Sequence, residues 1–200
     1  MVANGDEYAE VLERVKSGDI YLDLGCCFGQ DVRKLVFDGA PAENVFGTEL
    51  EQGFIDSGYD LFNDKNKLRA TFAVGDFFAP ETAGLTRATF DMIHASQFFH
   101  LFSWNEQVEA MTKALLLLKP VRGSMMFGYM AIFHEAKEID HPDVRSGRCW
   151  HHTVATFENL VEECARKAEL SLVHVVKIVE APEWYAAAGM LAMRFCVRLM

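Results

Sequence analysis

Two hydrophobic patterns alternate along this chain: short continuous runs of apolar residues, and apolar residues spaced three or four positions apart. Short runs predict buried strands, and the wider spacing predicts helices with one buried face. We expect strands at residues 20–24, 45–48, 70–74, 89–95, 124–132, 170–179 and 190–199. We expect helices at residues 6–15, 30–39, 104–118 and 157–168, and another, interrupted at Gly53 and Gly58, that ends near Phe62. Strands and helices in this order are typical of an α/β fold.

Two segments depart from this alternation. Residues 133–153 are polar and without periodicity, which predicts an irregular, lid-like loop of a length that is usually functional or disordered. Residues 181–189 join the last two strands, which we expect to form a closing hairpin.

The composition limits the class of protein. Two hundred residues, half of them hydrophobic, predict one globular domain over residues 1–200 with a short N-terminal helix in residues 1–19. A net charge of −10 without a Lys/Arg cluster argues against a nucleic-acid partner. The longest aliphatic run, residues 114–118, is too short to span a membrane. The acidic N-terminus does not resemble a signal peptide, and five cysteines without framework spacing indicate reduced thiols, so we expect a cytoplasmic protein.

The segment Tyr21–Gln30, YLDLGCCFGQ, is a strand that leads into a glycine-bearing turn and a helix. Gly25 and Gly29 leave room for a ligand to approach the backbone. The spacing D-x-G-x-x-x-G differs from the dinucleotide fingerprint. The carboxylate of Asp23 would repel a pyrophosphate and would suit a cationic amino group.

This motif, with TELE, GDFF, FDMIHAS and an LKP turn in the same order, resembles the class I S-adenosylmethionine (SAM) methyltransferases. Three longer segments are similar to fungal methyltransferases of terpenoid and meroterpenoid biosynthetic clusters: LDLGCCFGQDVRKL, SQFFHLFSW and CWHHTVATFENLV. Members of that group typically esterify a carboxylic acid. The resemblance implies a Rossmann-like, seven-stranded, mostly parallel sheet with an antiparallel C-terminal hairpin and helices on both faces. It also implies SAM as cofactor, S-adenosylhomocysteine (SAH) as product, no metal, and a small-molecule acceptor.

The resemblance places the methyl donor on ten residues: Asp23, Gly25, Cys26, Gly29, Glu49, Leu50, Asp76, Phe77, Ala95 and Ser96. Glu49 follows Gly29 by twenty residues, where an acid that binds ribose hydroxyls is expected. The alternative for Glu49 is a solvated residue at a helix start. Asp76 and Phe77 would bind adenine, or else form a turn and part of the core.

The acceptor is expected to contact Gln97, Phe98, Phe99, Trp104, Arg148, Trp150 and His151. His100 is the candidate catalytic residue, as a base or as a hydrogen-bond donor that orients the acceptor. A carboxylic acid is already ionised at neutral pH and needs no base. The aromatic residues are also compatible with simple packing, and Arg145 and Arg148 could hold a carboxylate or be solvated.

Three alternatives accompany this interpretation. Cys149, His151 and His152 suggest zinc, but their spacing lacks a second ligand pair. A nicotinamide-dependent oxidoreductase is disfavoured by Asp23 and by the missing middle glycine. The third alternative is a partner-dependent, non-catalytic module, because only nineteen residues precede the first strand. An apolar face left uncovered in such a module would predict a homodimer.

Overall fold

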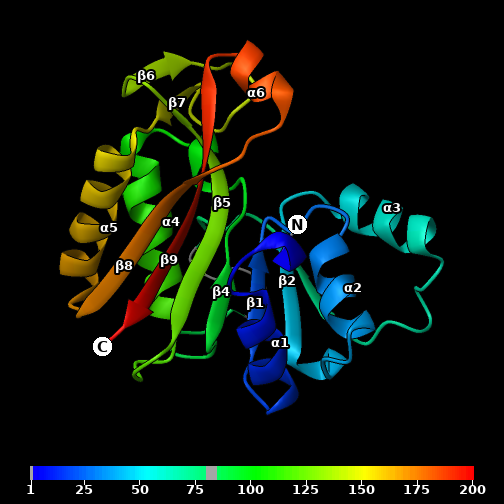
Figure 1. Ribbon diagram of the computed structural model, residues 1–200. Coiled ribbons are helices and arrows are strands. Elements are labelled where there is room, and N and C mark those ends of the chain that lie inside the picture. Colours follow the sequence, from blue (N-terminus) through cyan, green and yellow to red (C-terminus); the bar gives the residue numbers. More distant parts are fainter. Residues whose placement is uncertain (1, 80–84) are drawn as a thin grey trace. The chain divides into compact units, whose positions relative to one another are not determined.

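The computed structural model describes residues 2–79 and 85–200 (Figure 1). Seven strands form one sheet in the order β3-β2-β1-β4-β5-β9-β8, and β6 and β7 form a separate pair. The seven-stranded, mostly parallel sheet with antiparallel C-terminal strands confirms the predicted fold class. Contacts divide the chain into two units, one of residues up to His94 with Leu117–Lys119, the other of Ala95–Leu116 with Pro120–Met200.

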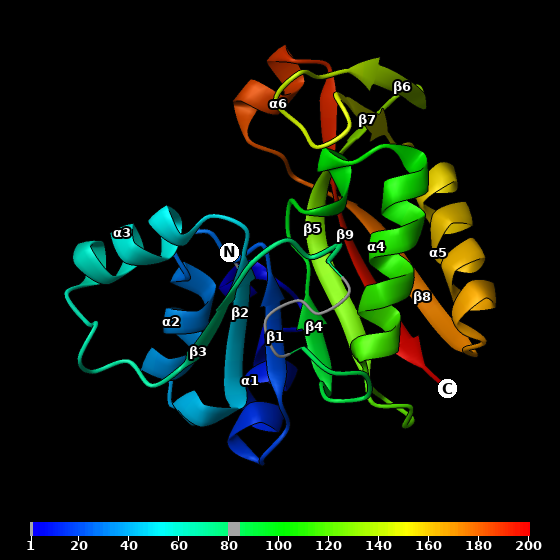
Figure 2. The ribbon, with the colours of Figure 1, turned by 180° about the vertical axis from the view of Figure 1, so that it is seen from behind.

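The first unit contains four parallel strands, β1 (Tyr21–Leu24), β2 (Val45–Glu49), β3 (Thr71–Val74) and β4 (Met92–His94). Its helices are α1 (Tyr8–Lys16), α2 (Gln30–Phe37) and α3 (Gln52–Phe62), with single 3₁₀ turns η1 (Val2–Asn4) and η2 (Ala42–Asn44). Helices α1 and α2 lie on the same face of these strands (Figures 1 and 2). All four residues of β1 are buried, which explains its continuous apolar run.

The second unit is built on three antiparallel strands, β5 (Met125–Phe133), β9 (Met190–Leu199) and β8 (Leu172–Val179). Helices α4 (Trp104–Leu117) and α5 (Val154–Ala168) lie together on one face of these strands (Figure 2). The rings of Phe157 and Phe195 pack 4.9 Å apart between α5 and β9. The single turn η3 (Phe99–Leu101) and the short helix α6 (Glu183–Ala187) complete this unit with β6 (Lys137–Asp140) and β7 (Arg148–His151).

Two segments differ from the expectation. The stretch 133–153, expected to be irregular, contains the antiparallel hairpin of β6 and β7. Trp150 N–H donates to the Phe102 carbonyl and Phe133 N–H to the His152 carbonyl, so hydrogen bonds anchor the open end of the hairpin. The connection between β8 and β9 is not a plain loop, because it folds into α6.

The expected interruption of α3 at Gly53 and Gly58 was wrong, since the helix is continuous from Gln52 to Phe62. Gly58 serves close packing instead. A Cβ atom there would lie 2.4 Å from the Phe28 carbonyl oxygen, so the missing side chain lets α3 approach the turn after β1. At Gly53, a Cβ atom would meet nothing within 4 Å.

These two glycines give a matched test of packing. We expect Gly58→Ala to lower the free energy of unfolding by about 1–3 kcal/mol, because backbone must move to accept the methyl group. Gly53→Ala in the same helix should raise it by up to about 1 kcal/mol through helix propensity. Urea unfolding of both variants measures the difference, and equal effects at the two positions would contradict the close approach.

Candidate functional site

The turn between β1 and α2 requires its glycines. Gly25 and Gly29 have φ of 66° and 68°, in the left-handed region that glycine tolerates. A Cβ atom at Gly29 would also lie 2.7 Å from the ring of Phe72. Close packing on Phe72 therefore requires glycine at position 29, which is buried, whereas Gly25 is exposed, so a ligand can approach the backbone of the turn there.

The carboxylate of Glu49, at the end of β2, fixes this turn. Its Oε2 accepts from Cys27 N–H at 2.9 Å, and its Oε1 accepts from the N–H groups of Leu50 at 2.8 Å and Glu51 at 3.2 Å. Oε1 thus uses both of its lone pairs, whereas Oε2 keeps one. Glu49 is therefore not a merely solvated helix-start residue, and its Oε2 can accept one further hydrogen bond from a hydroxyl group beside the turn.

Asp23 belongs to a buried, charged cluster. Its Oδ1 is 2.8 Å from His94 Nδ1 on the neighbouring strand β4. Burial raises the pKa of the Asp23 carboxyl, and the hydrogen-bonded His94 opposes that rise. Asp31, which accepts from Val2 N–H at 2.9 Å, brings a second carboxylate within 4.8 Å of the other two groups. Two carboxylates and one imidazole are side chains that could hold a positively charged group.

The other donor-site residues lie as follows. Asp76 Oδ1 accepts from Phe78 N–H at 2.9 Å in the turn after β3, next to the buried Phe77. This hydrogen bond is the turn contact of the alternative interpretation, and a role in adenine binding stays a prediction. Leu50 is 60% exposed, and Cys26 is buried.

Ala95 and Ser96 belong to the second unit. The N–H group of Ala95 donates to the Phe127 carbonyl at 2.8 Å, and the Ser96 hydroxyl donates to the Tyr129 carbonyl at 3.4 Å. Both residues are therefore bound to β5, and a contact with the donor stays a prediction.

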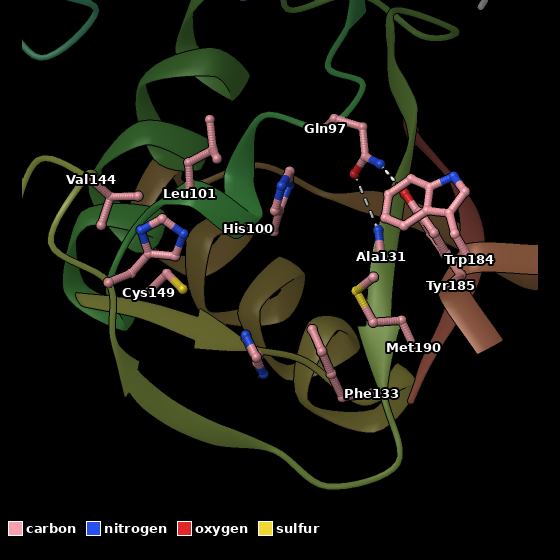
Figure 3. A pocket seen from close by; sticks show the side chains of 12 residues that line it. Gln97, His100, Leu101, Ala131, Phe133, Val144, Cys149, Trp184, Tyr185 and Met190 are labelled. Atoms are coloured by element: carbon pink, nitrogen blue, oxygen red, sulfur yellow. Dashed lines mark hydrogen bonds between the residues drawn. The ribbon is translucent and has the colours of Figure 1, made fainter. Parts of the chain in front are cut away.

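The second unit contains a cavity of about 250 Å³ (Figure 3). Residues from η3, β5, β7, α6 and β9 surround it. They are Gln97, His100, Leu101, Ala131, Phe133, His141, Val144, Cys149, His151, Trp184, Tyr185 and Met190. No Asp, Glu, Lys or Arg is among these twelve described residues. An apolar cavity with a few polar groups is the usual form of a small-molecule site.

Three histidines line the cavity, His100, His141 and His151, and burial shifts the pKa of two of them. Burial, with smaller contributions from His151 and His141, lowers the pKa of His100 to about 4. Burial also lowers the pKa of His151, whose ring stacks on Phe133 with centroids 3.5 Å apart. Within the described parts of the chain, the buried Nδ1 atoms of His100 and His151 have no hydrogen-bond partner. Both rings are neutral at neutral pH and can bond a ligand.

Gln97, His100 and His151 are the expected acceptor residues that line this cavity. Four expected aromatic residues lie outside the lining and pack on other rings: Phe98, Phe99, Trp104 and Trp150. Arg148 also lies outside it, 60% exposed and 3.1 Å from Glu138, and Arg145 is 3.8 Å from Glu106.

The zinc alternative gains little from the geometry. Both ring nitrogens of His152 are engaged, Nε2 with Gln107 Oε1 at 2.7 Å and Nδ1 with Thr156 Oγ1 at 3.1 Å. None of the five cysteines, which all lie in the described part of the chain, forms a disulfide. Among the described residues, no helix combines the length and the apolar character needed to cross a membrane.

Sequence reasoning missed the residues that α6 and β9 contribute. Trp184, Tyr185 and Met190 line the cavity although they come from the segment assigned to a connecting hairpin. The signal was the pair Trp184-Tyr185 in a short connection, where two large aromatic side chains need a surface to pack on.

Comparison with known proteins identifies relatives. A family model described as a methyltransferase domain matches residues 22–121. The chain is 34% identical over 181 residues to the O-methyltransferase phiE of Fungal sp.. The aligned segment covers 89% of this chain and 60% of the relative. It is 39% identical over 173 residues to the methyltransferase adrK of Penicillium rubens, covering 86% and 62%. The chain thus spans less than two thirds of the length of these curated relatives.

Solved structures support the fold. Phosphoethanolamine N-methyltransferase 2 of Haemonchus contortus, in complex with SAM, superposes with a TM-score of 0.68 at 12% identity, covering 96% of this chain and 51% of that chain. A SAM-dependent methyltransferase from Mesorhizobium loti gives a TM-score of 0.64 at 14% identity, covering 99% and 100%. At such identities the likeness concerns the fold.

The neutral, buried state of His100 predicts acid sensitivity. Because its pKa is lowered from 6.5 to about 4, the unfolded state binds a proton more readily, and stability falls as the pH drops below 6.5. We expect His100 to account for about 2 kcal/mol of lost unfolding free energy at about pH 5. Urea unfolding of wild type and His100→Gln at about pH 7 and about pH 5 measures this share. An equal loss in both proteins would contradict it.

Proposed function

This chain belongs to the class I SAM-dependent methyltransferases, and we propose that it methylates a carboxylate oxygen of a hydrophobic small molecule. A relative of the chain, 36% identical over 136 residues, is named for two small molecules, asnovolin E and chermesin D. That name supports an acceptor from a fungal secondary-metabolite pathway.

The residues of the first unit fit a SAM molecule. The turn after β1 exposes its backbone at Gly25, and the anchored Glu49 carboxylate beside the turn keeps one lone pair on Oε2 for a ribose hydroxyl. The cluster around Asp23 suits the cationic amino group of the methionine part. Asp76 and Phe77 would bind adenine. We also assign two residues to the donor by their place in the sequence, Leu50 next to Glu49 and Cys26 within the turn. We further assign Gly25, Ala95 and Ser96 to the donor.

When bound, SAM supplies a methyl group on a positively charged sulfur. In the proposed reaction an acceptor oxygen forms the new C–O bond while the C–S bond breaks, and SAH and a methyl ester result. The charges balance, because the sulfonium and the carboxylate are both neutralised. Holding two reactants in line can supply roughly 7–11 kcal/mol of the barrier reduction, so orientation is the main task of the protein.

The observation that carries the proposal is the weakness of the available base. His100 has a pKa of about 4 and no Asp, Glu or Lys lines the cavity, within the described residues. A phenol, with a pKa of about 10, would keep its proton beside such a base. A carboxylic acid has lost its proton at neutral pH and needs no base. The cavity therefore favours an acceptor that arrives ionised.

The same cavity can hold the rest of the acceptor. Phe133, Val144 and Met190 offer apolar surface, and the neutral imidazoles can each donate one hydrogen bond to an anion. A bound carboxylate would raise the pKa of His100 toward its ordinary value, since an opposite charge favours the imidazolium. His100 then orients and stabilises the acceptor rather than removing a proton.

Calorimetric titration with SAH tests the donor site. We expect Glu49→Gln to weaken SAH binding at least about tenfold, because the amide loses an acceptor for ribose and disturbs the N–H contacts that fix the turn. Glu51→Gln, at an exposed neighbour, is the matched control and should bind SAH as wild type does. NAD serves as the rival ligand. Binding of NAD and not of SAH would refute the proposal.

The pH dependence of transfer tests the acceptor class. With a carboxylic acid and radiolabelled SAM, we expect a rate that is nearly constant from about pH 6 to about pH 8, because the acceptor stays ionised. With a matched phenol, any rate should rise about tenfold per pH unit, following the phenolate. A phenol preferred at neutral pH would contradict a carboxylate acceptor. SAH binding without transfer to either class would favour the non-catalytic alternative.

A further inference from the structure

Gln97 has an unusual backbone conformation at the wall of the cavity. Its φ is 54°, in the left-handed region, which costs a residue with a Cβ atom about 1–2 kcal/mol. The Gln97 N–H group donates to the Tyr129 carbonyl at 2.7 Å, which holds the residue against β5. Strained backbone of this kind persists where its surroundings fix it, and it is frequent at ligand sites.

The side-chain amide of Gln97 is held in one orientation (Figure 3). Its Oε1 accepts from the Ala131 N–H group at 3.2 Å. Because a backbone N–H can only donate, it determines which end of the amide is oxygen. Nε2 then donates to the hydroxyl of Tyr185, and an amide nitrogen carries a second proton for another acceptor.

Tyr185 is the other half of this arrangement. It is 2% exposed, and helix α6 places its hydroxyl at Gln97, 88 residues away in the sequence. A side-chain hydrogen bond also joins Tyr185 to Tyr129, and because it favours the protonated form of Tyr129, we assign Tyr129 as its donor. The Tyr185 oxygen then accepts from Gln97 and Tyr129, and its own proton is left for another acceptor. Burial, and next the contact with Tyr185, raise the pKa of the neighbouring Tyr129 to about 12, so that phenol remains neutral.

We infer that Gln97 and Tyr185 form an uncharged pair of donors, one N–H and one O–H, that binds the carboxylate of the acceptor. Both residues line the cavity, and no Asp, Glu, Lys or Arg side chain does within the described residues. The inference rests on the proposed carboxylate acceptor. It assigns the binding of that carboxylate to Gln97 and Tyr185 rather than to Arg145 or Arg148. It assigns Tyr185 as a specificity-determining residue.

An uncharged receptor also suits the product. A carboxylate accepts strong, charge-assisted hydrogen bonds from both donors. Once one oxygen carries a methyl group, the ester is neutral and its hydrogen bonds are about half as strong. An arginine would add an uncompensated buried charge at that moment. Gln97 and Tyr185 therefore discriminate acid from ester without leaving a charge behind.

Direct binding of a probe tests the pair. Naphthoic acid and the neutral naphthyl methyl ketone have similar shapes, and calorimetry on the full chain, with and without SAH, measures both. We expect wild type to prefer the acid, and Tyr185→Phe to lose about ten- to hundredfold of its acid affinity while ketone affinity changes less than about threefold. Tyr129→Phe removes a neighbouring phenol outside the cavity lining and should keep the preference.

A second variant protects the test against misfolding. Gln97→Glu keeps an oxygen for Ala131 N–H and can accept from Tyr185, yet it adds a negative charge that repels the acid. It should abolish acid binding and retain ketone binding. Equal affinities of wild type for acid and ketone, or parallel losses of both probes in the two variants, would overturn the inference.

Transfer assays separate this inference from the proposed function. If Tyr185→Phe and Gln97→Glu methylate carboxylic acids with the KM of wild type, the donor pair is refuted and the function stands. If wild type binds naphthoic acid through the pair but methylates no carboxylic acid, the function is refuted and the binding site stands.

Discussion

The carboxylate of Glu49 organises the first unit, because it collects backbone N–H groups from two connections at once. Cys27 belongs to the turn after β1, and Leu50 and Glu51 to the start of α3. Behind the turn, the buried guanidinium of Arg33 donates twice to Asp64, at 2.7 and 3.0 Å. These contacts fix the carboxyl ends of neighbouring parallel strands, which is where open α/β sheets bind their ligands.

The second unit solves a different problem, which is to present polar groups in an apolar cavity of an acidic protein. The imidazoles of His100 and His151 are kept neutral by burial, and its amide and phenol are neutral by nature. Charged side chains nearby, such as Arg148 and Glu138, neutralise one another outside the cavity lining. The polarity inside the cavity thus comes from hydrogen-bond direction rather than from net charge.

Local sequence patterns predicted what depends on local physics. Strands β1 and β4 appear as apolar runs because both of their faces are buried, and the turn at Gly29 appears because φ of 68° selects glycine. Gly58 was misread, since a sequence does not distinguish a helix-breaking glycine from one that permits close packing. The β6–β7 hairpin was missed because its residues are mostly exposed and carry no alternating pattern. Tyr185 meets Gln97 only through tertiary folding across 88 residues, so no local pattern could place it in the cavity.

The contact between Ala131 N–H and Gln97 Oε1 has an evolutionary consequence. A backbone donor is the same for every residue type except proline, so substitution at position 131 changes the space in the cavity but leaves the direction of the Gln97 amide alone. In the proposed pair, recognition of the carboxylate therefore rests on the side chains of Gln97 and Tyr185. A descendant of this chain could exchange either one and acquire a different acceptor, while the register of β5, β8 and β9 stayed the same.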